Sequence, residues 1–208
     1  MDIDKNSWSF WYSKKEETID EEIPRLADLF KSKRISKILD LGCGTGRHTM
    51  YFAERGFEVY GFDFSPLAVK RAEERLKKKK LTAQLTVLDM RKNFPYKDEV
   101  FDAIVTIRVI HHARLRVVKK SIAEIERTLK KGGYFYADVP SRPRNLKNGN
   151  SKVKIVEPGT RVPLEGPEKG IPHHDFTEKE IFRVLRGFEI QEIRKKGSHF
   201  HILAKKGS

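Results

Sequence analysis

"ILDLGCGTGRHTMYFAERGFEVYGFDFS", residues 38–65, joins two apolar runs through a glycine-rich turn and a stretch with helical spacing. Gly42, Gly44 and Gly46 follow the first run, and Asp63 lies at the end of the second. Glycines lack a Cβ atom, so the chain can turn sharply and a ligand can lie against the main chain. A helix beginning near Gly46 would direct free N–H groups at something negative. The pattern predicts a nucleotide-type site, with Asp63 accepting hydrogen bonds from ribose hydroxyls.

The chain continues as an alternation of strands and helices. Apolar runs predict strands at 37–43, 57–64, 85–90, 101–109 and 134–140. Charged stretches with helical spacing predict helices at 45–56, 66–80 and 117–133, the last ending at Gly132 and Gly133. Because the strands are almost continuously apolar, we expect a sheet covered on both faces. The alternation predicts an α/β fold with a doubly wound, mostly parallel sheet.

The C-terminal third departs from this rhythm. Residues 141–175 are rich in proline and glycine without sustained periodicity, which predicts a long loop or a small insertion. A helix follows over 176–187, with Thr177 and Glu180 spaced as a capping box. The runs 187–196 and 199–206 are joined by so short a link that they must be antiparallel. We therefore expect the sheet to end in an antiparallel hairpin.

Composition limits the classes of protein and partner. Lys and Arg number 43 against 29 Asp and Glu, a net charge of +14. This excess favours anionic partners such as RNA, but Lys- and Glu-rich surfaces are also typical of proteins from hot environments. With Cys43 as the single cysteine, no intramolecular disulfide and no cysteine-based metal cluster can form. No apolar stretch suits export or a membrane span, so a cytoplasmic location is expected.

The glycine spacing distinguishes between nucleotide families. The dinucleotide pattern G-x-G-x-x-G would require glycine at position 47, where the chain has Arg47. "DLGCGTG" (40–46) instead fits D-x-G-x-G-x-G, and it resembles the class I S-adenosylmethionine-dependent methyltransferases. The segments 101–112 and 129–140 also resemble that family's fourth strand and its turn into the fifth. The resemblance covers residues 35–140 strongly and the remainder weakly.

The resemblance implies a seven-stranded Rossmann-like sheet and S-adenosyl-L-methionine as cofactor. In the family, the glycine loop packs on the methionine part, and acids after strands two and three meet the ribose and the adenine amino group. The implied cofactor residues are Asp40, Gly42, Cys43, Gly44, Gly46, Arg47, Asp63, Phe64, Ser65, Asp89, Met90 and Ile107. Residues 1–208 are expected to form one methyltransferase domain. Its parts are an N-terminal lid or helical segment (1–34), the cofactor core (35–140), a loop or insertion near the acceptor (141–175), and a final helix and hairpin (176–208).

Three histidines are the candidates for catalysis. Methyl transfer is an in-line displacement that depends mainly on alignment, and a nearby His adds general-base assistance. His111 and His112 follow the fourth strand, and they face opposite ways if the chain there is extended. His174, beside His173 and Asp175, suits a lid over the acceptor. Adjacent histidines rarely chelate one ion together, so no metal is expected.

Several features of the sequence allow two interpretations. Cys43 is expected to fit between glycines rather than act as a nucleophile, and Arg47 either reaches the cofactor carboxylate or is solvated. The N-terminal aromatics form either a lid over the cofactor or a helix packed on the core; they are Trp8, Phe10, Trp11 and Tyr12. The basic stretch 141–154 either contacts phosphate or is a solvated loop.

The favoured function is methyl transfer to a small-molecule acceptor, because the compact chain shows no recognisable RNA-binding appendage. An RNA methyltransferase, acting on tRNA or rRNA, is the alternative suggested by the basic charge. A nicotinamide-dependent oxidoreductase and a non-catalytic cofactor-binding partner protein are weaker alternatives. The acceptor atom and the oligomeric state stay open at this point.

Overall fold

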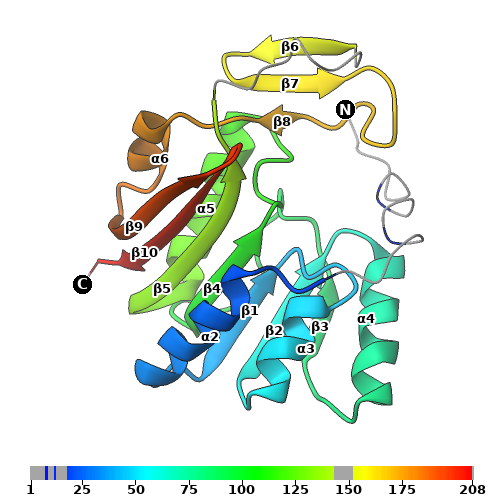
Figure 1. Cartoon of the computed structure of the whole chain (residues 1–208), viewed down its shortest axis with the longest axis vertical. Helices are drawn as coiled ribbons and strands as arrows, with labels where there is room; N and C mark the ends of the chain where they lie inside the picture. The colour runs from blue at the N-terminus through cyan, green and yellow to red at the C-terminus, as the bar shows by residue number, and fades with distance from the viewer. Residues whose placement is uncertain (1–7, 9–11, 13–17, 143–151, 208) are drawn as a thin grey trace.

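The main sheet has seven strands in the order β3-β2-β1-β4-β5-β10-β9 (Figure 1). The computed structural model describes residues 8, 12, 18–142 and 152–207 of the chain. Neighbouring strands are parallel through the first five positions: β1 Lys37–Leu41, β2 Glu58–Asp63, β3 Gln84–Val87, β4 Phe101–Ile107 and β5 Leu129–Pro140. β10, His199–Lys206, is antiparallel to both β5 and β9, Phe188–Lys196. The predicted fold class, including the C-terminal antiparallel hairpin, is confirmed.

Helices cover both faces of this sheet, and each face has its own apolar core. α2, Glu22–Ser32, and α3, Arg47–Glu54, pack on one face. α5, Leu115–Thr128, and α6, Glu178–Val184, pack on the other. α4, Pro66–Lys78, connects β2 to β3. No helix in the described part of the chain has the length and apolarity needed to cross a membrane.

Local sequence accounts for the start of α6 but not for the end of α5. Thr177 and Glu180 form the predicted capping box at the start of α6. α5 ends at Thr128, whereas its predicted pattern ran to the glycine pair. Leu129 is extended and fully buried, and it pairs with Phe101 of β4, so β5 begins there and takes in both glycines. Tertiary pairing therefore ends this helix before its own stop signal does.

The segment 141–175 contains a second, three-stranded antiparallel sheet. Its strands are β6 Val153–Glu157, β7 Thr160–Pro163 and β8 His173–His174. It lies beyond the carboxyl ends of the main-sheet strands (Figure 1). A hydrogen bond of 2.8 Å from the His174 amide to the His111 carbonyl joins it to the turn after β4. This insertion positions new side chains over the predicted site, while residues 143–151 of the basic stretch lie outside the described residues.

Candidate functional site

Two adjoining cavities lie at the carboxyl ends of β1, β2 and β4, where the sequence predicts the site. The aromatic cavity, of about 100 Å³, is bordered by Phe62, Phe64 and Met90. The histidine cavity, of about 400 Å³, is bordered by Asp40, Gly44 and several histidines. Six residues line both cavities and mark their junction: Trp8, Tyr12, Gly42, Arg108, Val109 and His112.

The glycine loop is shaped by positive φ angles and close approaches. Gly42, Gly44 and Gly46 have φ of 77°, 55° and 84°, a region that strongly favours glycine. A Cβ atom on Gly42 would lie 2.3 Å from a methyl carbon of Val109, and one on Gly46 would lie 2.9 Å from Cβ of Ala72. Gly42 and Gly44 border the histidine cavity, whereas Gly46 is the N-cap of α3 and packs against α4.

The amides of this loop bind the protein itself. Gly42 and Cys43 both donate to the carbonyl of Phe62, at 2.8 and 3.0 Å, and Gly46 donates to the carbonyl of Cys43 at 2.9 Å. Gly44 donates to Asp63 Oδ2 at 3.0 Å. These four amides are therefore used within the protein. Of them, only the Gly46 amide lies at the helix start where free N–H groups were expected, and it bonds to Cys43.

Asp63 borders the aromatic cavity, and donors hold both of its carboxylate oxygens. Oδ1 accepts from the amide of Ser65 at 2.9 Å, and Oδ2 accepts from the Tyr12 hydroxyl at 3.1 Å as well as from Gly44. The carboxylate is only 6% exposed. Tyr12 thus occupies, from the N-terminal segment, the position predicted for a ribose hydroxyl. Ser65 caps α4 by accepting from the Ala68 amide and does not line either cavity.

Asp40 and Cys43 are buried beside the glycines. Asp40 Oδ2 accepts from the Thr49 hydroxyl at 2.7 Å. Burial raises the pKa of Asp40 to about 6, although the Thr49 hydrogen bond and the charge of Arg47 act against this. Burial also raises the pKa of the Cys43 thiol well above its usual value, which argues against a thiolate nucleophile. Arg47 borders the histidine cavity and donates to the carbonyl of Thr18 at 2.9 Å.

Asp89 follows β3 and borders the aromatic cavity, as predicted. Both of its oxygens lie 2.8 Å from Arg91 Nε, and the Arg91 amide donates to Oδ1 at 2.9 Å. Burial alone would raise the pKa of Asp89, but these bonds to Arg91 outweigh it and hold the pKa below its usual value. The Arg91 guanidinium lies 5.5 Å from the ring centre of Phe64.

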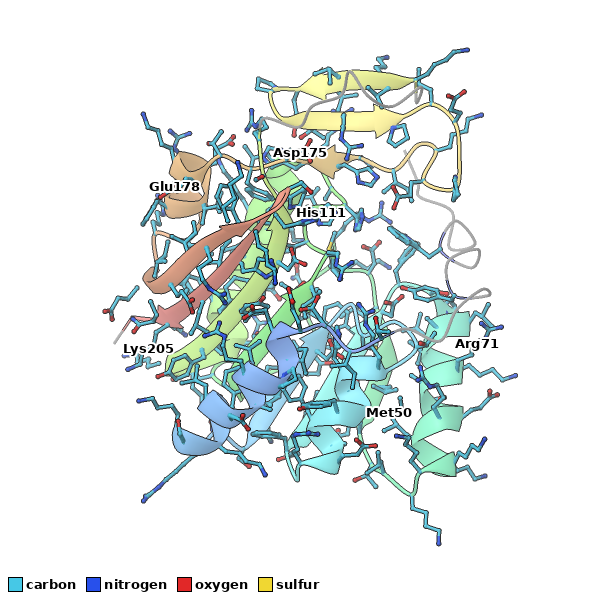
Figure 2. All side chains as sticks on the ribbon, viewed as in Figure 1. Met50, Arg71, His111, Asp175, Glu178 and Lys205 are labelled. Atoms are coloured by element: carbon cyan, nitrogen blue, oxygen red, sulfur yellow. The ribbon has the colours of Figure 1, made fainter. Side chains whose placement is uncertain are left out.

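Five of the chain's seven histidines line the histidine cavity: His48, His111, His112, His173 and His199. His111 lies between the ends of the main-sheet strands and the smaller sheet (Figure 2). His111 and His112 are in a turn, closed by the His112 amide bonding to Val109 at 3.0 Å, so their rings do not face opposite ways. Their ring centres are 3.9 Å apart. Burial lowers the pKa of His48 to about 3, which keeps that ring neutral.

The smaller sheet brings His173, rather than His174, into the cavity. Successive strand residues point to opposite faces. His174 is fully buried, with Nδ1 2.7 Å from the Thr160 hydroxyl and its ring against Phe176. Its amide bonds to the His111 carbonyl, but His174 borders neither cavity, so it is not part of the wall that His111 and His112 form. Sequence alone could not choose between the neighbours, because the register of a two-residue strand depends on its partners.

Sequence reasoning also missed Arg108. This residue follows β4 with φ of 59°, an uncommon angle for a non-glycine residue, and it borders both cavities. Its guanidinium lies 3.0 Å from Asp20 Oδ2 and 3.3 Å from the buried Asp138 Oδ2. These two ion pairs link the start of α2 to β4 and β5. The backbone angle of Arg108 could not be predicted from the sequence, because a left-handed conformation is usually indicated by Gly or Asn.

Two of the N-terminal aromatic residues, Trp8 and Tyr12, contact residues of the site. Trp8 lies edge-on against the His112 ring, with ring centres 4.7 Å apart. Arg71 of α4 donates to the Tyr12 carbonyl. Trp8 and Tyr12 therefore border the site, while Phe10 and Trp11 lie outside the described residues. Ile107, at the end of β4, also borders the histidine cavity.

Comparisons with known proteins agree with this geometry. A family model described as a methyltransferase domain matches residues 39–137. Probable tRNA methyltransferase 9B of Bos taurus is 26% identical over 168 residues, which cover 73% of this chain and 35% of that protein. Norajmaline N-methyltransferase of Rauvolfia serpentina is 30% identical over 145 residues, which cover 65% of this chain and 49% of that protein. The chain thus spans about half or less of the length of these relatives.

A solved structure extends the match beyond these residues. The crystal structure of a SAM-dependent methyltransferase from Methanosarcina mazei is 25% identical, with a TM-score of 0.69 over 83% of this chain and 93% of that one. The residues that the family model matches include the glycine loop, Asp63 and Asp89, which leaves the nicotinamide alternative without support. This chain belongs to the class I S-adenosylmethionine-dependent methyltransferases.

Proposed function

We propose that the protein transfers a methyl group from S-adenosyl-L-methionine to a small polar acceptor in the histidine cavity. The observation that carries this proposal is the junction of two unlike cavities at Gly42 and Val109. The aromatic cavity suits an adenosine, and the larger polar cavity has space for an amino-acid group and an acceptor. A donor lying across the junction brings its reactive carbon to the cavity lined by histidines.

The residues present fit the donor. Asp63 has the buried carboxylate that a ribose diol requires, and its present partner Tyr12 already shows that a hydroxyl fits on Oδ2. Asp89 and Phe64 border the space for the adenine. Asp40 lies beside the expected ammonium group, whose positive charge would favour the ionised carboxylate. When bound, the donor supplies a methyl group on a positively charged sulfur.

The protein's own contribution would be alignment and proton handling. His111, His112 and His173 border the cavity on the acceptor side, and a neutral imidazole accepts a proton from a hydroxyl, thiol or ammonium. A positioned base of this kind typically contributes about 10²–10⁴-fold. Alignment of acceptor and methyl contributes more, up to about 7–11 kcal/mol in favourable cases. Of the three histidines, we propose His112 as the base, because it lies at the junction of the two cavities.

The proposal is tested by turnover with labelled donor against a panel of thiols, amines, phenols, carboxylates and bulk RNA. Binding of S-adenosylhomocysteine is measured by calorimetry on the same sample. Label in a low-molecular-weight product, reduced about 10²-fold or more in His112→Gln with cofactor affinity retained, would support the assignment. Cofactor binding without transfer to any acceptor would favour a non-catalytic binding protein.

RNA as acceptor is the second candidate, and a specific surface favours it. Arg114, Arg116 and Lys119 are exposed and directly follow His112 in the chain, at the start of α5. Within the described ranges, Arg116 and Lys119 form no ion pair with an acidic residue, while the charge of Arg114 acts on Glu157. Exposed cations close in sequence to a residue of the site are suited to phosphate contacts. The similarity to a probable tRNA methyltransferase also covers more of the chain than the family model does.

Salt dependence separates the two acceptors. Binding of bulk tRNA is measured for the wild type and for a variant with Arg114, Arg116 and Lys119 replaced by Gln. If RNA lies on this surface, the slope of log affinity against log salt falls by about two to three, since each lost phosphate contact removes about 0.7–0.9. A matched control replaces Lys31, Lys77 and Lys78, exposed lysines at the far ends of α2 and α4, and should keep the slope. Equal slopes in both variants would leave only non-specific attraction.

A further inference from the structure

Three histidines from distant parts of the chain converge in the wall of the histidine cavity. His111 and His112 come from the turn after β4, and His173 comes from β8 of the smaller sheet. One ring nitrogen of each lies within 4.8 Å of the others. His111 and His173 are buried, and His112 is half-buried. We propose that His111, His112 and His173 bind one Zn²⁺ ion.

The turn after β4 allows adjacent histidines to share an ion, contrary to the expectation from the sequence. Adjacent histidines on an extended strand point apart, which is why the pair was not expected to share an ion. Here the rings of His111 and His112 are 3.9 Å apart and tilted by 39°. The His173 ring lies 4.8 Å from His112 and 5.9 Å from His111. All three rings therefore meet on one side of the turn.

The chemistry of the group suits a transition metal. Three imidazoles this close repel one another if protonated, whereas neutral rings each offer a lone pair to a shared cation. Zn–N bonds of about 2.0–2.1 Å in a tetrahedral site imply nitrogens about 3.4 Å apart. The nitrogens must therefore approach by about 1.4 Å at most from their present 4.8 Å. His112, the most exposed of the three, is the ring with freedom to make that movement.

The surroundings are compatible with a cation. Glu168 Oε2 lies 3.4 Å from His173 Nε2, so a carboxylate stands behind one ligand and can orient it. Arg108, which borders the cavity, is paired with Asp20 and Asp138. The hydrogen bond from His174 to the His111 carbonyl fixes the two contributing segments together. Three protein ligands with a fourth position toward a cavity is the arrangement of catalytic rather than structural zinc.

The role of the ion rests on the proposed methyl transfer, although its binding does not. With the ion bound, the imidazole of His112 is a ligand and no longer accepts the proton, so the ion replaces it as the group that activates the acceptor. The open coordination position would take the acceptor's hydroxyl or thiol, and the ion would lower the pKa of that group so that its proton leaves to solvent. The acceptor lone pair then forms the bond to the methyl carbon. The carbon–sulfur bond of the sulfonium breaks with its electron pair remaining on sulfur, and the ion keeps its oxidation state.

The test is calorimetric titration of Zn²⁺ into the full chain after chelator treatment, with Co²⁺ absorption as a spectroscopic check. We expect one ion per chain and a tetrahedral Co²⁺ spectrum. His173→Gln and His112→Gln should each weaken binding at least about 100-fold, since loss of an outer-shell partner alone costs 10–100-fold. His199→Gln is the matched control, because His199 borders the same cavity outside the cluster and should leave Zn²⁺ affinity unchanged.

Two results would overturn the site: no stoichiometric binding by the folded wild type, or equal losses in His199→Gln and His173→Gln. Thermal unfolding of each variant checks that the fold is intact. Parallel titration with S-adenosylhomocysteine separates this proposal from the proposed function. Zn²⁺ binding without S-adenosylhomocysteine binding keeps the metal site and rejects the donor, and the reverse keeps the donor and rejects the metal.

Discussion

Tyr12→Phe should tighten cofactor binding. The Tyr12 hydroxyl donates to Asp63 Oδ2 at 3.1 Å, on the oxygen that the donor's ribose is proposed to use. A hydrogen bond to a charged group contributes about 1.5–3 kcal/mol net. Tyr12 is only half-buried, so water competes and the lower end applies. The ribose must break this bond in the wild type but not in the variant, and 1.4 kcal/mol corresponds to about tenfold in the dissociation constant.

Calorimetry with S-adenosylhomocysteine on both proteins measures this difference. Tyr60→Phe is a matched control, because the Tyr60 hydroxyl also donates to a carboxylate, Glu58 at 2.9 Å, but lies outside both cavities. Its cofactor affinity should equal that of the wild type. If Tyr12→Phe binds with unchanged or weaker affinity while the control behaves as expected, the ribose does not displace Tyr12 from Asp63, and the reasoning is refuted.

Three further changes test the site and its frame. Asp63→Asn should weaken S-adenosylhomocysteine binding about tenfold or more while circular dichroism stays unchanged, and full affinity would place the ribose elsewhere. Gly46→Ala should lower the denaturation midpoint more than Gly56→Ala. Both glycines have φ near +80°, but only at Gly46 would the new Cβ lie against Ala72, at 2.9 Å. Gly56→Ala should lower the free energy of unfolding by about 1–2 kcal/mol. Burial raises the pKa of Asp40 from 3.8 to about 6, so the fold loses stability as the pH rises between these two values, and the loss is complete above about pH 6. Asp40→Asn should then be more stable than the wild type by up to about 3 kcal/mol at pH 8, with the gain shrinking toward pH 4 in thermal melts.

The sequence predicts the part of the fold whose signals are local. β1, α3 and β2 follow from apolar runs and glycines, and the capping box of α6 is present as its spacing indicates. The prediction is less accurate where distant partners decide the structure. Leu129 is recruited into β5 by Phe101, and β8 exists only because β7 and the turn after β4 pair with it. Such contacts leave no periodicity in a segment of two residues.

The same distinction applies to the site. Asp40, Asp63 and Asp89 were found because each lies at or just after the carboxyl end of a strand, and the fold class fixes where these ends lie. The choice of His173 over His174 depends on strand register, which a neighbouring strand sets. Tyr12 carries no motif, since its place on Asp63 is reached from 51 residues away in the chain. Motif spacing thus predicts the ligand-binding frame, while the groups that cover it require the structure.

The N-terminal segment connects the two halves of the site. Tyr12 bonds to Asp63 at the aromatic cavity, and Trp8, four positions earlier, packs on His112 at the histidine cavity. The Tyr12 amide donates to the Trp8 carbonyl at 3.3 Å, so we expect a ligand that displaces Tyr12 from Asp63 also to change the packing of Trp8 on His112. Binding at the two cavities is then coupled through one short segment, and by linkage the coupling is reciprocal. Any change that the donor makes in affinity at His112 must be matched by an equal change that a ligand at His112 makes in donor affinity.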